Sequence, residues 1–191
     1  MLTNSERRYG SVAVTLHWLI ALAIIGMLIL GKYMADLPNS DPSKFDLIQL
    51  HKSFGISILA LSVLRLAWRL VNKVPPLPPQ MPTWERYAAH ASHFLLYVLM
   101  IGIPLSGWAM VSASPLGIPT IWFGQFEIPH LPGLQGLADQ HAAESQLKEV
   151  HELLGNLMIA LLLIHVGAAL KHHLWDRDDV LTRMLPFVKT K

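Results

Sequence analysis

Residues 150–171 have the sequence VHELLGNLMIALLLIHVGAALK, a long and strongly apolar run. Its centre is interrupted only by Asn156, and a histidine lies toward each end, His151 and His165. The hydrocarbon core of a bilayer is about 30 Å thick and is crossed by about 20 apolar residues in a helix. The run therefore predicts a transmembrane helix with a histidine near each membrane surface.

Three earlier segments have the same length and character, at residues 12–31, 47–70 and 88–111. Together with residues 150–171 they predict an all-α fold, a transmembrane four-helix bundle in which both termini lie on one side of the membrane. The first segment is too long for the apolar region of a secretory signal, and no cleavage site of small residues follows it. We therefore expect residues 1–191 to form a single membrane domain.

The composition supports this class. The chain has 191 residues, of which 52% are hydrophobic and 15% charged, with a net charge of +2 and no cysteine. Soluble domains carry about 25% charged residues, so a soluble enzyme is excluded. The same low share of charged residues argues against a disordered chain. The small net charge argues against nucleic acid as a partner. The lack of cysteine excludes disulfides, thiolate catalysis and Fe–S clusters.

Basic residues are distributed unequally between the two sides. The termini and the linker after the second segment hold 11 of the 15, namely Arg7, Arg8, Arg65, Arg69, Lys73, Arg86, Lys171, Arg177, Arg183, Lys189 and Lys191. The other side holds Lys32, Lys44, Lys52 and Lys148, together with eight of the 13 acidic residues. Because cytoplasmic loops are enriched in Lys and Arg, both termini are predicted to be cytoplasmic.

The connections differ in kind. Residues 74–79, VPPLPP, predict a stiff polyproline linker on the inner side. Residues 113–147 are predicted to form a long outer loop at the membrane interface, because Trp122 and Phe123 lie among its Pro and Gly residues. Residues 134–150 have the composition of a short helix that runs into the fourth span.

Four histidines fall at two depths. His17 and His165 lie toward the cytoplasmic ends of their spans, and His51 and His151 lie at the outer ends. His151 and His165 are 14 residues apart, which is about 21 Å along a helix and leaves them within about 40° of one face. Ionisable residues inside a span indicate function by default.

Several interpretations fit this pattern. Structural zinc takes four ligands, whereas each level offers two imidazoles. A six-coordinate haem takes two axial ligands from facing helices, and small residues near the histidines would make room for it: Gly55, Gly155, Gly167, Ala168 and Ala169. Hydrogen bonding to water or headgroups is the alternative. His93 lies level with His17 and His165, so spacing alone leaves it open as a ligand.

Several short motifs occur along the chain in the same order as in a known family. These motifs are Tyr9-Gly10 with Leu16-His17-Trp18-Leu19, Leu50-His51-Lys52-Ser53 with Gly55, Arg65-Leu66-Ala67-Trp68-Arg69-Leu70, His93-x-x-Leu96-Tyr97, Val150-His151-Glu152, Ile164-His165-Val166, Ala169-Leu170-Lys171-His172-His173, and Asp178-Asp179-Val180-Leu181-Thr182-Arg183-Met184. The chain resembles the bacterial cytochrome b561 family, four-helix di-haem cytochromes of the inner membrane.

This resemblance implies two haem groups held by four histidine ligands to iron. Depth pairs them as His17 with His165 at the inner haem and His51 with His151 at the outer haem. His93 then takes a role beside the ligands or at a substrate site. Cations that could meet the inner haem propionates are Arg65, Arg69 and Lys171, with Lys52 or Lys148 at the outer haem; each of these also fits a snorkelling side chain. The haems would be b-type because thioether attachment needs cysteine.

The resemblance also implies a function. We expect a multi-pass protein of the bacterial inner membrane that oxidises superoxide, or another one-electron donor at the outer face, and reduces ubiquinone. The alternative is a haem b anchor subunit that relays electrons between a partner dehydrogenase or hydrogenase and the quinone pool. A homodimer is an expected assembly, and the sequence assigns no catalytic residue beyond the haem ligands.

Overall fold

The computed structural model describes residues 1–6 and 8–186 of the chain. Its element order is α1 (Ser11–Asp36), α2 (Lys44–Val71), α3 (Thr83–Ala113), β1 (Thr120–Trp122), β2 (Phe126–Ile128), α4 (Gln140–Lys171) and a short π-helix η1 (His172–Asp176). Of the basic residues counted from the sequence, Arg7, Lys189 and Lys191 lie outside the described residues.

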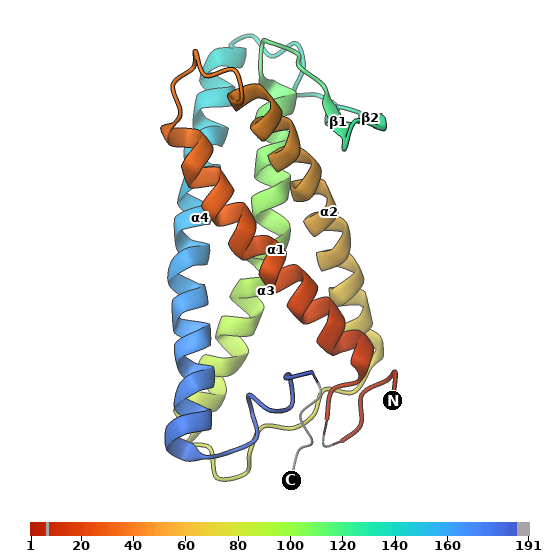
Figure 1. Ribbon diagram of the computed structural model, residues 1–191, viewed down its shortest axis with the longest axis vertical. Helices are drawn as coiled ribbons and strands as arrows, with labels where there is room; N and C mark the ends of the chain where they lie inside the picture. Colours follow the sequence, from red (N-terminus) through yellow and green to blue (C-terminus); the bar gives the residue numbers. More distant parts are fainter. Residues whose placement is uncertain (7, 187–191) are drawn as a thin grey trace.

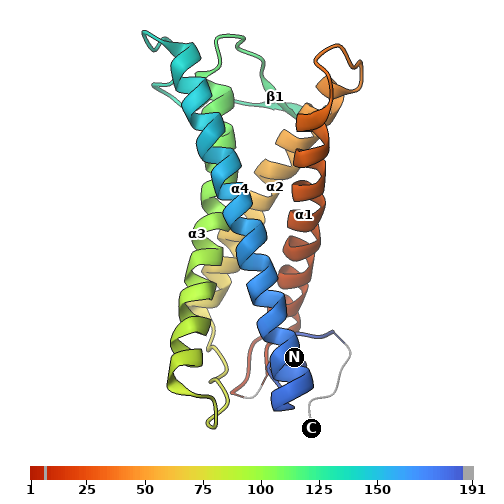
Figure 2. The same ribbon diagram turned by 90° about the vertical axis from the view of Figure 1, so that its left-hand side faces the viewer.

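The four long helices form an elongated bundle, as Figure 1 shows. The first described residues, the segment that follows α4 and the linker between α2 and α3 lie at one end, called here the inner end (Figures 1 and 2). The loops after α1 and α3 lie at the other, the outer end. All four helices are long and apolar enough to cross a membrane. The prediction of an all-α, four-helix transmembrane bundle is therefore confirmed.

Most of the apolar surface of the bundle faces outward. Side chains such as Leu22 and Leu163 remain 64% and 71% exposed, which suits a solvent of lipid tails rather than water. The buried core is small and consists of Ile20, Ile24, Ile58, Leu96, Leu99, Met100 and Met158. These residues come from all four helices and lie between the two histidine levels.

The helices extend beyond the predicted spans, and the largest difference concerns the outer loop. Helix α4 begins at Gln140, so the predicted loop 113–147 ends earlier than expected. The Asp139 carboxylate accepts a hydrogen bond from the Ala142 N–H at 2.9 Å and caps the helix start. The helix predicted over residues 134–150 is therefore confirmed in part, because α4 begins at Gln140 and runs unbroken into the fourth span.

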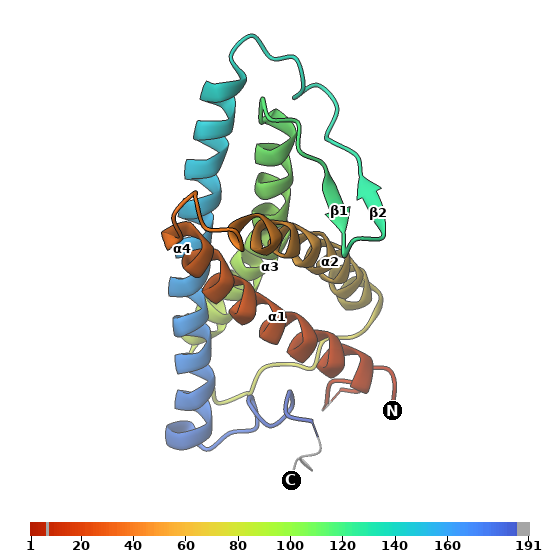
Figure 3. The ribbon, with the colours of Figure 1, turned by 45° about the horizontal axis from the view of Figure 1, so that its top comes forward.

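The outer loop also contains structure that the sequence did not indicate. Strands β1 and β2 pair antiparallel, with Trp122 opposite Phe126, and Figure 3 shows the hairpin beside α2. Ser53 of α2 accepts a hydrogen bond from the Phe123 N–H at 3.0 Å, and Ser57 accepts one from the Trp122 indole at 3.0 Å. The hairpin thus covers hydroxyl groups of α2 that would otherwise face lipid.

Candidate functional site

The outer histidine pair joins α2 to α4. The rings of His51 and His151 lie with centroids 6.2 Å apart and planes at 76°. His151 Nδ1 lies 3.1 Å from the Ile103 carbonyl oxygen and 3.0 Å from Ser106 Oγ, both on α3. A carbonyl oxygen only accepts hydrogen bonds, so Nδ1 carries the ring proton and donates it. The Nε2 lone pair of His151 is therefore free to bind a metal.

Two glycines let neighbouring backbones approach these rings. A Cβ at Gly107 would lie 3.0 Å from His151 Cε1, and one at Gly31 would lie 3.3 Å from His51 Cε1. Sequence reasoning missed both and named other glycines instead; a Cβ at Gly155 or Gly167 would meet no described atom within 4 Å. The contacts of Gly31 and Gly107 depend on how the helices cross, which the sequence pattern does not contain.

The inner level holds three histidines rather than two. The His165 ring lies 6.3 Å from that of His17 and 5.6 Å from that of His93, measured between centroids. Helices α1, α3 and α4 each contribute one ring. The sequence placed all three at one depth, and the structure brings them into one cluster.

Arginine side chains from α2 border this inner cluster. Arg65 donates from Nη1 to the Ala13 carbonyl at 3.0 Å, and its Nη2 lies 3.2 Å from His17 Nδ1. Because guanidinium only donates, His17 Nδ1 is the acceptor here and Nε2 carries the proton. Arg69 lies one turn further along α2, with its Cζ 5.8 Å from the centre of the Tyr97 ring.

Lys171, expected near the inner haem, is engaged elsewhere. Its ammonium lies 2.7 Å from Glu85 Oε1 and 2.8 Å from Asp176 Oδ2. The neighbouring His172 lies 2.7 Å from Asp178 through Nδ1. These contacts tie the inner ends of α3 and α4 to the C-terminal segment, so Lys171 has carboxylate partners of its own within this network.

At the outer end, the expected cation Lys52 donates to the Pro119 carbonyl at 2.8 Å and so holds the loop before β1. Lys32, which the sequence did not single out, donates to Asn156 Oδ1 at 2.9 Å and links α1 to α4. Asn156 lies five positions after His151 on α4. The cation linked to α4 just below the outer pair is therefore Lys32 rather than Lys52.

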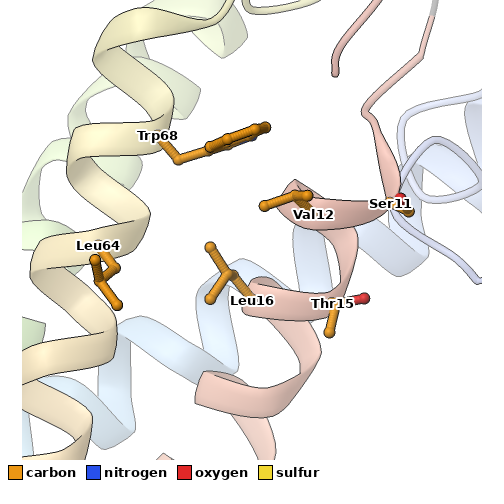
Figure 4. A pocket seen from close by; sticks show the side chains of 6 residues that line it. All are labelled: Ser11, Val12, Thr15, Leu16, Leu64 and Trp68. Atoms are coloured by element: carbon orange, nitrogen blue, oxygen red, sulfur yellow. The ribbon is translucent and has the colours of Figure 1, made fainter. Parts of the chain in front are cut away.

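An apolar cleft of about 440 Å³ opens between α1 and α2 at the inner end. Val12, Leu16, Leu64 and Trp68 point into it, whereas the hydroxyls of Ser11 and Thr15 point away (Figure 4). Leu16 and Leu64 directly precede His17 and Arg65 in the chain. The cleft therefore lies between the stretches of α1 and α2 that carry His17 and Arg65.

The donor atoms fit haem better than other metal groups. Imidazole nitrogens lie about 2.0 Å from a bound metal, and the ring centroid lies about 1 Å further out, so two imidazoles on opposite sides of one iron have centroids about 6 Å apart. The pairs at 6.2 and 6.3 Å match this separation. His51 Nδ1 is also buried without a hydrogen-bond partner among the described residues, a costly arrangement outside functional sites.

The fold and the two histidine levels define a class, the membrane-embedded helical bundles that hold metal groups between facing helices. The comparison with known proteins is more specific. The model of the family described as prokaryotic cytochrome b561 matches residues 8–187. The chain belongs to this family, which implies that it is a membrane cytochrome that binds haem b.

Three relatives show the range of the family. Cytochrome b561 homolog 2 of Escherichia coli (strain K12) is 38% identical over 184 residues, covering 96% of this chain and 94% of the relative. A protein of Yersinia pestis named "Probable superoxide oxidase CybB" is 30% identical over 184 residues, covering 95% and 97%. Cytochrome b562 of Cereibacter sphaeroides is 26% identical over 187 residues, covering 95% and 98%.

Proposed function

We propose that the chain is a di-haem b-type cytochrome that transfers electrons across the bacterial inner membrane. His17 and His165 would ligate the inner haem, and His51 and His151 the outer haem. The observation that carries this proposal is the equal spacing of the two ring pairs, 6.3 and 6.2 Å between centroids, at opposite ends of one bundle.

Haem bound by two imidazoles supplies one-electron transfer, because neither axial position is left for oxygen or substrate. The protein's contribution is to fix the ligands and to surround them. The Ile103 carbonyl accepts the Nδ1–H of His151 and so favours the tautomer whose unprotonated Nε2 can bind iron. For His17 to present Nε2, its Nδ1 must take the proton and Arg65 must give up the contact seen at 3.2 Å.

The released Arg65 side chain is then available to an anion such as a haem propionate, with Arg69 beside it. We do not extend this role to Lys171, whose ammonium is held by two carboxylates. His93 is retained beside the ligands, because its ring packs on His165 at 5.6 Å. We propose that it supports the orientation of His165 rather than binding iron.

We further propose that the outer donor is superoxide and that the inner acceptor is ubiquinone, with both termini in the cytoplasm. The relative named as a superoxide oxidase supports the donor, and the excess of basic residues at the inner end supports the orientation. The cleft between α1 and α2 has a volume within the range of small-ligand sites. Its apolar wall and its closeness to His17 suit a quinone ring.

Stopped-flow reduction of the haem-loaded protein tests this function. Superoxide is expected to reduce the haems rapidly, and ubiquinone to reoxidise them. Reduction only by a co-purifying dehydrogenase or hydrogenase, with no response to superoxide, would instead support the anchor-subunit function. A sample with one haem per chain or none would contradict the di-haem proposal itself.

A further inference from the structure

The two histidine levels differ in the charges and dipoles around their ligands. We propose that Arg65 at the inner level, and the Ile103 carbonyl and Ser106 hydroxyl at the outer level, set unequal midpoint potentials, with the inner haem more easily reduced. This inference rests on the proposed function and assigns a direction, from the outer site to the inner site, to its electron transfer. One electron leaves the outer site, which is oxidised, and reaches the inner site, which is reduced, without any bond or proton being transferred.

At the outer level the ligand is made more electron-rich. The His151 Nδ1–H has two acceptors on α3, the Ile103 carbonyl at 3.1 Å and Ser106 Oγ at 3.0 Å. Hydrogen bonding from the distal nitrogen of a ligating histidine raises its basicity. A more basic imidazole stabilises oxidised iron relative to reduced iron and so lowers the midpoint potential of the outer site.

At the inner level the surroundings are positive. The Arg65 guanidinium is half-buried with Nη2 3.2 Å from the His17 ring, and Arg69 follows one turn later on α2. A nearby positive charge favours the reduced state of an iron centre, because the added electron is attracted to it. This would also hold once Arg65 has left His17 for a propionate, since it would then neutralise a negative charge beside the haem.

The charges at the outer level do not offset this difference. Glu152, next to His151, and Lys32, bound to Asn156, are both exposed and have opposite signs. Lys52, next to His51, is half-buried, and its ammonium donates to the Pro119 carbonyl at 2.8 Å. Exposed charges are screened by salt within about 10 Å at 0.1 M ionic strength, whereas partly buried charges are screened less. Two half-buried arginines lie at the inner level and one half-buried lysine lies at the outer level, so the inner level keeps the larger positive charge beside its ligands.

A redox titration of the haem-loaded full chain, followed by the reduced α-band, tests the proposal. The single-haem variants His165→Ala and His151→Ala assign each potential, because the first is expected to keep the outer haem and the second the inner haem. We expect the electron to prefer the inner haem over the outer haem at least tenfold. For a one-electron couple, this preference corresponds to an inner midpoint potential at least 59 mV above the outer one. Equal potentials, or a higher outer potential, would overturn the inference.

Substitutions at the two levels give independent checks. Arg65→Gln is expected to lower only the inner potential, and Arg65→Lys, which keeps the charge, to restore most of it. Ser106→Ala is expected to raise only the outer potential, because the His151 Nδ1–H loses one of its acceptors. Arg86→Gln is the matched control, since Arg86 donates to the carbonyls of Met81 and Pro79 outside the histidine cluster.

The outcomes separate this inference from the proposed function. Fewer than two haems in the unmodified chain would contradict the proposed function. Two haems whose potentials respond equally to Arg65→Gln and Arg86→Gln would leave the cytochrome function in place and disprove the role of Arg65. Two haems with the expected order but no shift in Ser106→Ala would disprove the outer half of the proposal.

Discussion

The Nδ1 atom of His151 on α4 lies 3.1 Å from the carbonyl oxygen of Ile103 on α3. Ile103 directly precedes Pro104, which lies inside α3. Helix α3 contributes neither member of the outer histidine pair, yet its Ile103 carbonyl accepts the Nδ1–H of His151. With Gly31 of α1 against the His51 ring, all four long helices border the outer site.

The first prediction concerns the pairing of the histidines. His151→Ala is expected to remove only the outer haem and His165→Ala only the inner haem, because the two residues lie about 21 Å apart on α4. Pyridine haemochrome assays should give about half the haem of the unmodified protein in each variant, and electron paramagnetic resonance should show a different low-spin signal lost in each. Loss of the same signal from both variants would contradict the pairing.

The second prediction concerns Gly107. Gly107→Val is expected to displace the His151 ring, because even a Cβ at this position would lie 3.0 Å from Cε1. Haem content should fall toward half, with the outer signal lost. Gly102→Val on the same helix is the matched control, since a Cβ there would meet no described atom within 4 Å. Similar haem loss in both variants would mean that helix flexibility, and not the ring contact, is responsible.

The third prediction concerns Lys171. Lys171→Met is expected to leave both haems and their potentials unchanged, because the ammonium is bound by Glu85 and Asp176. The side chain is 44% exposed, so the loss of its solvent-screened ion pairs should change the stability of the protein little. A thermal melt and a redox titration of the same sample check both parts. A shifted inner potential would place Lys171 back at the haem.

The fourth prediction concerns the outer hairpin. Ser53→Ala removes the acceptor of the Phe123 N–H, and an unpaired buried donor costs about 1–3 kcal/mol. The Phe123 φ of 44° adds to the need for this contact, since bulky residues rarely adopt positive φ. We expect faster proteolysis between α3 and α4 in membrane vesicles. Ser92→Ala is the control, because the Ser92 hydroxyl donates to the Ala89 carbonyl of its own helix; equal cleavage of both variants would show that the hairpin does not depend on Ser53.

The fifth prediction concerns orientation. Fusion of green fluorescent protein to the C-terminus should give a fluorescent product, and fusion of alkaline phosphatase there should be inactive, because the basic residues gather at the inner end. The opposite pair of results would invert the proposed direction of electron flow across the membrane.

The sequence alone determined the class and the ligand candidates. Runs of apolar residues define membrane helices because lipid cannot satisfy backbone polar groups, and the depth of a histidine follows from its position within a run. This is why the bundle, the two levels, and the placement of His93 level with His17 and His165 could all be predicted.

The tertiary structure decided what surrounds those histidines. Gly31 and Gly107 contact the rings, Ile103 orients His151, and Arg65 rather than Lys171 reaches the inner cluster. These contacts join residues that are 20 to 52 positions apart in the chain, as for Arg65 with Ala13 at a separation of 52 and Gly31 with His51 at 20. They depend on how the helices rotate and cross, which side-chain packing sets and hydrophobic periodicity does not encode.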